Sequence, residues 1–542
     1  MSSAAQTSPR GGDLDRPRVL TSLNRLAVAL DRFWFPGLSL LVLAYAAMMV
    51  RYSRAKLIWH DEIFTLVIAS APTLGRMWHE IATIDLNPPL SYLLTRWSIR
   101  AFGSGDLALR LPSIAGFLLA WVSLFFYVRR RMSTPWAFAA VLLFWNTVAF
   151  GYAWEARPYA LMLGLTSALI WCWSLPLSWE PGRSRPERDV LAAVGIFVLG
   201  VALLSTHMLA LFGYLPVVLT QGVRSLRLRR PEVGMSVALL LPLPLMFAFA
   251  RLTSHVGRYL YPAATLPTLS MVSDLYVSFA TSILLPLLLL LFCSLLLPSL
   301  RDRVQSGVAA RPVEEVVLWT ALALSPVAVL VALRVRHVGF GERYFLLGTL
   351  GLTLVLPSCS VSRIRGSPAA GALAAVMFFL FFHRSIGHNG HPGEPVSRSS
   401  FVPLQRSLSQ IEIGSTGLPI VVAHADGFVE LDYREDPAFA SRTYFLMSRP
   451  DAIRYAQLTL YEEEIAGLAR VAPLHAHVED YSDFLAQHHH FLVLSTSPES
   501  PYDGSEWVVR KLMDQGANLR LLGKTPPGYT DSLVYDVTLA PR

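Results

Sequence analysis

The sequence predicts an α-helical protein that crosses a membrane about eleven times and carries a soluble α/β domain at its C-terminus. Three observations lead to this prediction. Hydrophobic residues make up 53% of the chain and charged residues only 15%, whereas soluble proteins have about 25% charged residues. Apolar segments of helix-spanning length recur between about residues 33 and 383. From about residue 395 the composition is that of a soluble protein.

Each predicted span has close to the roughly 20 apolar residues that a transmembrane helix needs. The spans are expected near 33–52, 107–128, 136–153, 158–178, 190–205, 207–221, 233–250, 275–299, 313–333, 343–360 and 367–383.

The charges of the connecting segments predict the orientation in the cell (inner or plasma) membrane. Every second connection is rich in arginine, as cytoplasmic loops are. These connections are 128–135, 180–189, 224–231, 300–312 and 362–368. The net charge of +8 is thus explained by topology, and a nucleic-acid partner is not expected.

This orientation divides the chain into three parts. A cytoplasmic segment (1–32) precedes the transmembrane domain (33–385), whose first outer loop (51–106) is unusually long and therefore expected to be functional. The extracytoplasmic domain (395–542) has strand-like runs such as "LPIVVA" and "FLVLS" between helical patterns, which predicts a small, largely parallel α/β sheet. It has no glycine-rich nucleotide motif.

The first outer loop begins with an acid pair, Asp61 and Glu62, in "WHDEIFTLVIAS". A carboxylate at the mouth of an outer cavity can accept a proton from a hydroxyl as a general base. Neighbouring helical residues point about 100° apart, so the two acids are expected to differ in role. The pair can also simply end the first span in solvent, and the motif alone leaves both readings open.

Several arginines lie on the outer side, where the charge rule disfavours them. They are Arg157, Arg251, Arg258, Arg334, Arg336 and Arg343. An arginine at a helix end commonly extends its charge to the membrane surface. A group of them on one side also fits a pocket for a lipid phosphate, which guanidinium groups bind in a bidentate manner.

Four segments together resemble a known family. "HDEIFTLVIAS", "DLNPPLSYLLTRWSIRAFGSGDLALRLPS", "YAWEARPYALML" and "GERYFLL" are similar, in that order, to the GT-C membrane glycosyltransferases. The nearest branch contains protein O-mannosyltransferases and lipid A aminoarabinose transferases. The resemblance implies inverting transfer of a sugar from a polyprenyl-phosphate donor to a lipid, polysaccharide or protein acceptor on the outer face.

The resemblance also implies roles for individual residues. Asp61 falls on the catalytic base. The candidates for binding the lipid phosphate are Arg157, Arg258, Arg336, Arg343 and Tyr344, and the supporting or acceptor-side candidates are Glu62, Asn87 and His207. Relatives commonly carry histidine where this chain has Asn87. A divalent metal (Mg²⁺ or Mn²⁺) is left open, with His60, Glu62 and Glu80 as candidate ligands.

Two other functions share many of these features. A transporter or flippase of lipid-linked saccharides would also have many spans and a basic phosphate pocket, but its functional acids should lie near mid-bilayer, often within an internal repeat. No clear repeat is present. A polysaccharide polymerase or ligase would use similar donors but should lack the "DE" and "NPPL" order.

Overall fold

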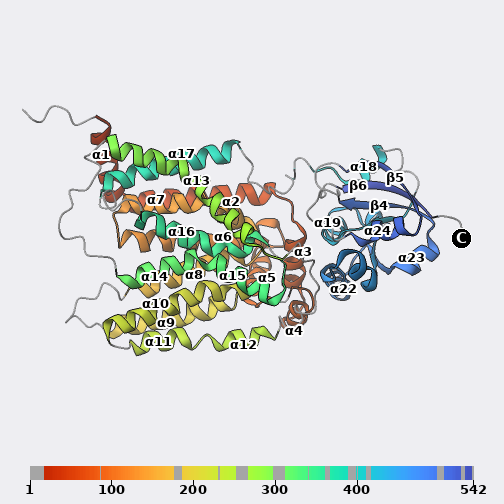
Figure 1. The fold of residues 1–542 in the computed structure, drawn as a ribbon, viewed down its shortest axis with the longest axis horizontal. Helices are drawn as coiled ribbons and strands as arrows, with labels where there is room; N and C mark the ends of the chain where they lie inside the picture. The colour runs from red at the N-terminus through yellow and green to blue at the C-terminus, as the bar shows by residue number, and fades with distance from the viewer. Residues whose placement is uncertain are drawn as a thin grey trace, which may run out of the picture.

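The computed structural model describes residues 18–85, 87–175, 186–229, 232–251, 266–296, 312–339, 341–359, 367–388, 398, 401–410, 417–496, 506–525 and 532–539. A bundle of long helices forms one end of the molecule, and a smaller domain built on a sheet forms the other (Figure 1). The bundle corresponds to the predicted transmembrane domain and the sheet domain to the predicted soluble domain.

Every predicted span falls on one or two helices of the bundle. These helices are α2 (Trp34–Ala55), α6 (Asp106–Arg129), α7 (Thr134–Trp145), α8 (Tyr159–Ser174), α9 (Pro186–Leu204), α10 (Leu211–Leu228), α11 (Val233–Leu240), α12 (Pro244–Ala250), α13 (Leu269–Leu296), α14 (Val313–Ala323), α15 (Ser325–Arg336), α16 (Leu346–Cys359) and α17 (Pro368–His388). One more helix, α1 (Arg18–Arg32), precedes the first predicted span. Among the described residues, five helices are long and apolar enough to cross a membrane, or up to seven if each bent pair is one span. The multi-pass architecture is confirmed, and the count of eleven stays a prediction.

Two bent pairs interrupt the bundle. α7 and the 3₁₀ helix η2 (Val148–Trp154) meet at 75°, and α14 and α15 meet at 47°. Non-helical backbone at membrane depth is tolerated only where protein or a water-filled cavity surrounds it. η2 is followed within three residues by Arg157, and α15 is followed by the 3₁₀ helix η8 (Glu342–Phe345), which contains Arg343.

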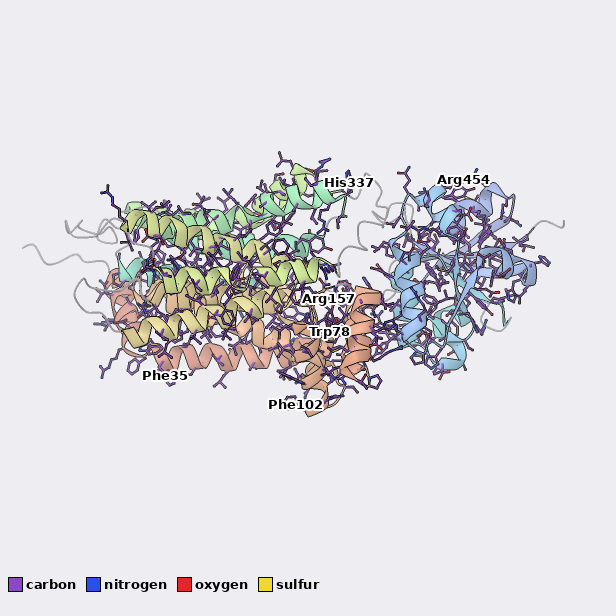
Figure 2. All side chains as sticks on the ribbon, turned by 90° about the horizontal axis from the view of Figure 1, so that it is seen from below. Phe35, Trp78, Phe102, Arg157, His337 and Arg454 are labelled. Carbon is purple, nitrogen blue, oxygen red and sulfur yellow. The ribbon has the colours of Figure 1, made fainter. Side chains whose placement is uncertain are left out.

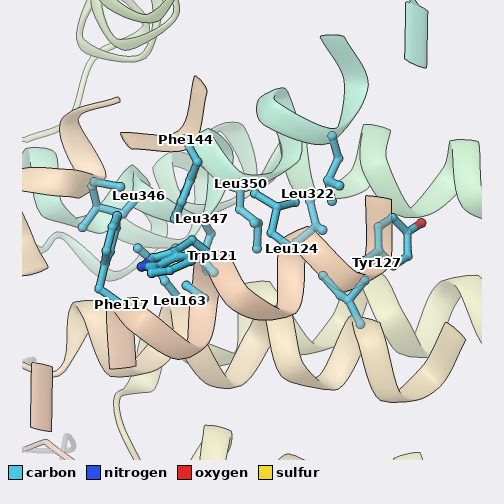
Figure 3. Close-up of a cluster of buried hydrophobic side chains, with 14 of the residues drawn as sticks. Phe117, Trp121, Leu124, Tyr127, Phe144, Leu163, Leu322, Leu346, Leu347 and Leu350 are labelled. Atoms are coloured by element: carbon cyan, nitrogen blue, oxygen red, sulfur yellow. The ribbon is translucent and has the colours of Figure 1, made fainter. Parts of the chain in front are cut away.

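The core of the bundle centres on α6. Phe117, Trp121 and Leu124 are almost fully buried and pack against α7, α8, α14 and α16 (Figure 3). α6 and α8 approach so closely at Gly116 and Gly164 that a Cβ added to Gly116 would lie 2.4 Å from the Cα of Leu161. Small residues allow such close crossings in membranes, where close packing drives helix association.

The first outer loop folds into four short helical elements. They are α3 (His60–Ser70), α4 (Leu74–Glu80), the π-helix η1 (Ile81–Asp85) and α5 (Leu90–Phe102). The loop is therefore largely helical. Trp97 and Phe102 are exposed, as expected for anchors in the membrane interface. Tyr92 is not, because it is fully buried and its hydroxyl binds Asp85.

The soluble domain contains a six-stranded mixed sheet of order β3-β2-β1-β4-β6-β5. Its strands are β1 (Ile420–Val422), β2 (Thr443–Met447), β3 (His477–Asp480), β4 (His490–Thr496), β5 (Asn518–Lys524) and β6 (Ser532–Thr538). The first four strands pair in parallel, whereas β6 pairs antiparallel with β4 and β5. The predicted α/β character is correct, and the parallel part consists of the four adjacent strands β3, β2, β1 and β4.

Eight helical elements accompany the sheet. They are α18 (Leu404–Gln410), α19 (Ala425–Arg434), α20 (Pro437–Ala440), α21 (Arg449–Asp451), the π-helix η9 (Ala452–Ala456), α22 (Leu460–Val471), α23 (Tyr481–Gln487) and α24 (Trp507–Asp514) within the described range. Gly516, which follows the C-terminal cap of α24, has φ +76°, a conformation that favours glycine.

The soluble domain rests on the first outer loop through α19 and α22. Arg434 donates from Nε and Nη2 to the carbonyl oxygen of Ile58, at 3.2 and 2.6 Å. α22 lies so close to η1 that a Cβ on Gly467 would be 3.0 Å from the carbonyl oxygen of Thr83. Phe428 and Ile465 of the soluble domain share one hydrophobic cluster with α3 and η1. The end of the bundle is thus covered by the soluble domain.

Candidate active site

Asp61 lies at the covered end of the bundle, in the first turn of α3, and is 7% exposed. Its Oδ2 accepts a hydrogen bond from Nη1 of Arg343 at 2.6 Å and lies 3.7 Å from Nε of Arg157. Figure 2 shows Arg157 at the end of the bundle that faces the soluble domain. The structure therefore joins the predicted base to two of the predicted phosphate-binding arginines.

Local chain geometry brings these arginines to Asp61. Arg157 follows η2 and immediately precedes Pro158, the residue before α8. Arg343 lies in the 3₁₀ helix η8 (Glu342–Phe345), which leads into α16. Pro158 ends the preceding turn and is well suited to the start of a helix. Both guanidinium groups thus come from short turns between spans.

Asp85 is a second carboxylate of the site. Arg157 contacts it with both Nη atoms, at 2.8 Å from Nη1 to Oδ2 and 3.4 Å from Nη2 to Oδ1. The hydroxyl of Tyr92 donates to Oδ2, and Nδ2 of Asn87 donates to Oδ1 at 2.7 Å. Arg157 therefore bridges Asp61 and Asp85, and Asn87 orients Asp85. Asp85 is not among the site residues predicted above, because nothing in the local sequence marks Arg157 as its partner.

The environment of Asp61 keeps it ionised. Burial alone would raise the pKa of Asp61, but Arg157 and Arg343 outweigh this effect and hold the pKa well below its usual range. In this arrangement the carboxylate is a weak base, since its charge is already neutralised by two guanidinium groups.

Glu62 forms a buried ion pair with Arg110. It is fully buried, and both its oxygens bind Arg110, at 2.8 Å from Nε and 2.7 Å from Nη2. The backbone N–H of Ala156 also donates to it at 2.7 Å. Arg110 in turn donates to the carbonyl oxygens of Ser53, Lys56 and Leu57. Glu62 and Arg110 thus hold the end of α2, α3 and the turn before Arg157 together, and an acceptor-side or metal role of Glu62 stays a prediction.

Lys56 is a buried cation that sequence reasoning missed as a site residue. Its Nζ lies 2.8 Å from Oε1 of Glu155 and 5.5 Å from the ring centre of Trp59. The guanidinium of Arg343 lies 5.7 Å from the same ring centre. The chain has only three lysines. The presence of one of them directly after the first predicted span was the only sequence feature that could have marked Lys56 as a site residue.

The candidate metal ligands do not converge. Glu80 pairs with Arg76 at 2.9 Å, Glu62 with Arg110, and His60 with acids of the soluble domain. Among the residues that the structure describes, no group of three or more His, Cys, Asp or Glu side chains could hold a metal ion. Use of a divalent metal stays an open prediction.

The remaining predicted residues are dispersed. Arg336 is exposed at the end of α15, and Arg258 lies outside the described residues. Tyr344 is half-buried, with the guanidinium of Arg343 5.9 Å from its ring centre. His207 is buried; its Nδ1 accepts from the N–H of Leu209 at 3.0 Å. Of the five predicted phosphate ligands, the structure brings Arg157 and Arg343 to Asp61.

His207 lies at the turn between α9 and η4 (Met208–Ala210), and its ring centre is 5.3 Å from that of Tyr159. The carbonyl oxygen of the nearby Ser205 accepts from the N–H of Leu90 at 2.8 Å. This turn therefore touches the first outer loop, as a wall of the predicted cavity would. A role of His207 toward the acceptor stays a prediction.

Comparison with solved structures identifies the architecture. The crystal structure of ArnT from Cupriavidus metallidurans in the apo state superposes with a TM-score of 0.50, covering 93% of this chain and 99% of that chain at 14% identity. The chain has the ArnT fold. The same protein bound to undecaprenyl phosphate gives a TM-score of 0.48 at 14% identity, covering 92% of this chain and 99% of that one. No protein-family model and no curated protein matches the sequence.

The likeness to ArnT confirms the predicted GT-C architecture at the level of the fold. It extends over the bundle and the soluble domain, since nearly the whole length of both chains is covered. Because the sequences share only 14% identity, the chemistry must be argued from the residues of this chain and not from ArnT.

Proposed function

We propose that this chain is a membrane glycosyltransferase. It transfers a sugar from a polyprenyl-phosphate donor to an acceptor hydroxyl, with inversion, on the extracytoplasmic face of the cell membrane. The observation that carries the proposal is the buried Asp61 carboxylate, which pairs with both Arg157 and Arg343 beneath the soluble domain. The ArnT fold supports this reaction class by analogy only.

The two arginines suit the donor phosphate. Arg343 donates to Asp61 from Nη1, and a guanidinium group has further N–H donors with which it can bind another anion. Among the described residues, the Nε atoms of Arg157 and Arg343 are buried without a hydrogen-bond partner. A buried donor left unpaired costs about 1–3 kcal/mol, which an incoming phosphate oxygen would recover. The same cations would stabilise the negative charge that develops on the leaving phosphate.

The reaction is a single displacement. The acceptor oxygen forms a bond to the anomeric carbon of the sugar while the bond from that carbon to the phosphate oxygen breaks. The acceptor proton passes to Asp61, and the electron pair of the broken bond stays on the polyprenyl phosphate. Attack opposite the leaving phosphate inverts the anomeric centre.

The arginine pairs of Asp61 explain how donor and base are linked. With Arg157 and Arg343 bound to it, the pKa of Asp61 lies well below its usual range, and a carboxylate of low pKa accepts protons poorly. A phosphate that draws the guanidinium groups away makes Asp61 more basic when the donor is in place. The base is thereby activated by the substrate.

The arrangement gives less support to a transporter or flippase. Such a protein needs functional acids near mid-bilayer. Asp61 and Asp85 belong instead to the first outer loop, which α19 and α22 cover.

The test uses the full-length protein in lipid nanodiscs. A panel of polyprenyl-phosphate sugars and of lipid, polysaccharide and protein acceptors is offered to wild type, to Asp61→Asn and to Asp106→Asn. Asp106 is a matched control, because it also begins a helix and pairs with an arginine, Arg398, at 2.5 Å. We expect transfer by wild type and by Asp106→Asn, and a loss of about 10²–10⁴-fold in Asp61→Asn.

Transfer from nucleotide sugars, with none from lipid-linked donors, would overturn the donor assignment. Movement of an intact lipid-linked sugar across the membrane without transfer would favour the flippase. Equal transfer by Asp61→Asn and wild type would remove Asp61 from the mechanism.

A further inference from the structure

We propose that His60 is a positioning residue for Asp61, through which helix α19 of the soluble domain acts on the reaction. This inference rests on the proposed function. It assigns a mechanistic part to the soluble domain, for which the sequence predicts a fold but no function.

The backbone just before Asp61 is held by α19. The N–H of His60 donates to Oε1 of Glu430 at 3.2 Å. Oε2 of Glu430 accepts from Nη1 of Arg434 at 2.8 Å, and Arg434 also binds the carbonyl oxygen of Ile58. Three hydrogen bonds to α19 therefore hold the chain in place, two at Ile58 and one at His60. Because Asp61 follows directly, a movement of α19 moves the first turn of α3 and its carboxylate.

The imidazole of His60 lies among three carboxylates. Its Nε2 is 3.6 Å from Oδ1 of Asp426 and 4.0 Å from Oδ1 of Asp61, and its Nδ1 is 3.7 Å from Oε1 of Glu430. Two of these acids belong to α19 and the third is the proposed base. A cation at this position attracts all three, so His60 joins the soluble domain to the site electrostatically as well as through its backbone.

The surroundings keep His60 charged at neutral pH. Burial alone would lower its pKa, but Asp426, Glu430 and Asp61 raise the pKa to about 9. Glu464 of α22 also faces this cluster. Burial, Asp426, Asp61 and Asp85 raise the pKa of Glu464 to about 8, so this acid is mostly protonated at pH 7 and adds little negative charge.

Loss of the His60 charge would leave Asp426 and Glu430 facing Asp61 as like charges. Like charges repel, and they also make a carboxylate harder to ionise. The soluble domain would then be held less firmly on α3, and Asp61 would lose its fixed direction toward the acceptor. The ring centre of Trp59 is 4.6 Å from that of His60, and the guanidinium of Arg343 lies over the same Trp59 ring. A displacement of His60 would therefore also affect Arg343, the proposed phosphate ligand.

The test compares four variants of the full-length protein in nanodiscs. His60→Gln removes the charge, His60→Arg keeps it, and Glu430→Gln keeps an acceptor for the backbone N–H. His475→Gln is the control, because exposed His475 also pairs with an acid of α19, Asp432, at 4.0 Å. Asp432 is two positions from Glu430, about 200° around the helix, and so lies on the opposite face of α19. Each variant is measured by sugar transfer over a range of pH and by hydrogen exchange of peptides from α3 and α19.

We expect His60→Gln to lower kcat about 10- to 100-fold with little change in KM for the donor, since misplacement of a reacting group costs this much. Its α3 and α19 amides should exchange faster than those of wild type. His60→Arg should restore most of both properties, and His475→Gln should match wild type.

Unchanged kcat, pH profile and exchange in His60→Gln would overturn the proposal. Faster exchange with an unchanged kcat would also overturn it, because His60 would then hold the domain without positioning Asp61. Failure of wild type to use any lipid-linked donor would instead refute the proposed function, and the exchange data would still report whether His60 joins α19 to α3.

Discussion

Nη1 of Arg343 donates to Oδ2 of Asp61 at 2.6 Å, although the two residues are 282 positions apart in the chain. The pair joins the first outer loop to the turn before α16. It makes each partner unavailable for its proposed task, because the carboxylate cannot act as a strong base and part of the guanidinium cannot bind phosphate. The proposed function requires a donor that separates them.

The arginines are therefore expected to affect donor binding and catalysis together. Arg343→Ala and Arg157→Ala should each lower kcat/KM for the lipid-linked donor by about 10²-fold, the usual cost of removing one cation or donor that stabilises a developing negative charge. Steady-state kinetics with one defined donor measures this change.

Arg336→Ala serves as the control for both variants, because Arg336 is exposed at the end of α15. It should keep nearly full activity. Equal losses in Arg336→Ala and Arg343→Ala would mean that general surface charge, and not the pair with Asp61, matters for donor use.

The Glu62–Arg110 pair is expected to stabilise the fold. Glu62→Ala leaves the guanidinium of Arg110 buried without its carboxylate, and breaking such a pair costs about 3–5 kcal/mol. Thermal unfolding of the purified protein should show a clear drop in Tm. Glu463→Ala, which removes an exposed pair with Arg449, should change stability by about 1 kcal/mol or less.

A Glu62→Ala protein with wild-type Tm but no sugar transfer would contradict this assignment. It would return Glu62 to the acceptor-side role that the sequence alone had allowed.

The contact between the soluble domain and α3 should weaken at high pH. The pKa of His60 is raised from 6.5 to about 9, so its stabilising effect is complete below pH 6.5 and is lost as the pH rises through about 9. Hydrogen exchange of α3 and α19 peptides should therefore accelerate between about pH 8 and 10, beyond the intrinsic increase seen in a peptide from α6. A His60→Arg variant should lack this step.

The crossing of α6 and α8 should not tolerate a larger residue. Gly116→Ala places a Cβ against the backbone of Leu161, and overpacking typically costs about 1–3 kcal/mol. Gly222→Ala in α10, where nothing lies within 4 Å of the added carbon, is the matched control and should be neutral or stabilising. Similar Tm values for the two variants would refute the close contact.

Much of the architecture could be predicted from the sequence because long apolar runs are a strong signal. The pattern also placed Asp61, Arg157 and Arg343 on one side of the membrane. It could not separate these arginines from Arg336, since snorkelling and phosphate-binding arginines look alike locally. The short turns after η2 and at η8 decide which arginine side chains reach Asp61.

Other parts depend on contacts between distant segments. The first acid pair gave no sign that Glu62 would bind Arg110, 48 positions away. Glu430 lies 370 positions from His60, and no local pattern predicts such a contact. Strand β3, "HVED", was missed because it is polar and only partly buried, so it lacks the alternation that marks a strand.

The measurement that tests the central claim most directly follows Asp61→Asn in two assays on the same nanodisc sample. The first is single-turnover transfer, and the second is equilibrium binding of an unreactive polyprenyl phosphate. Transfer should fall by about 10²–10⁴-fold, while binding should become tighter, because the carboxylate no longer competes for Arg157 and Arg343. Undiminished transfer, or weaker binding of the phosphate, would contradict the account.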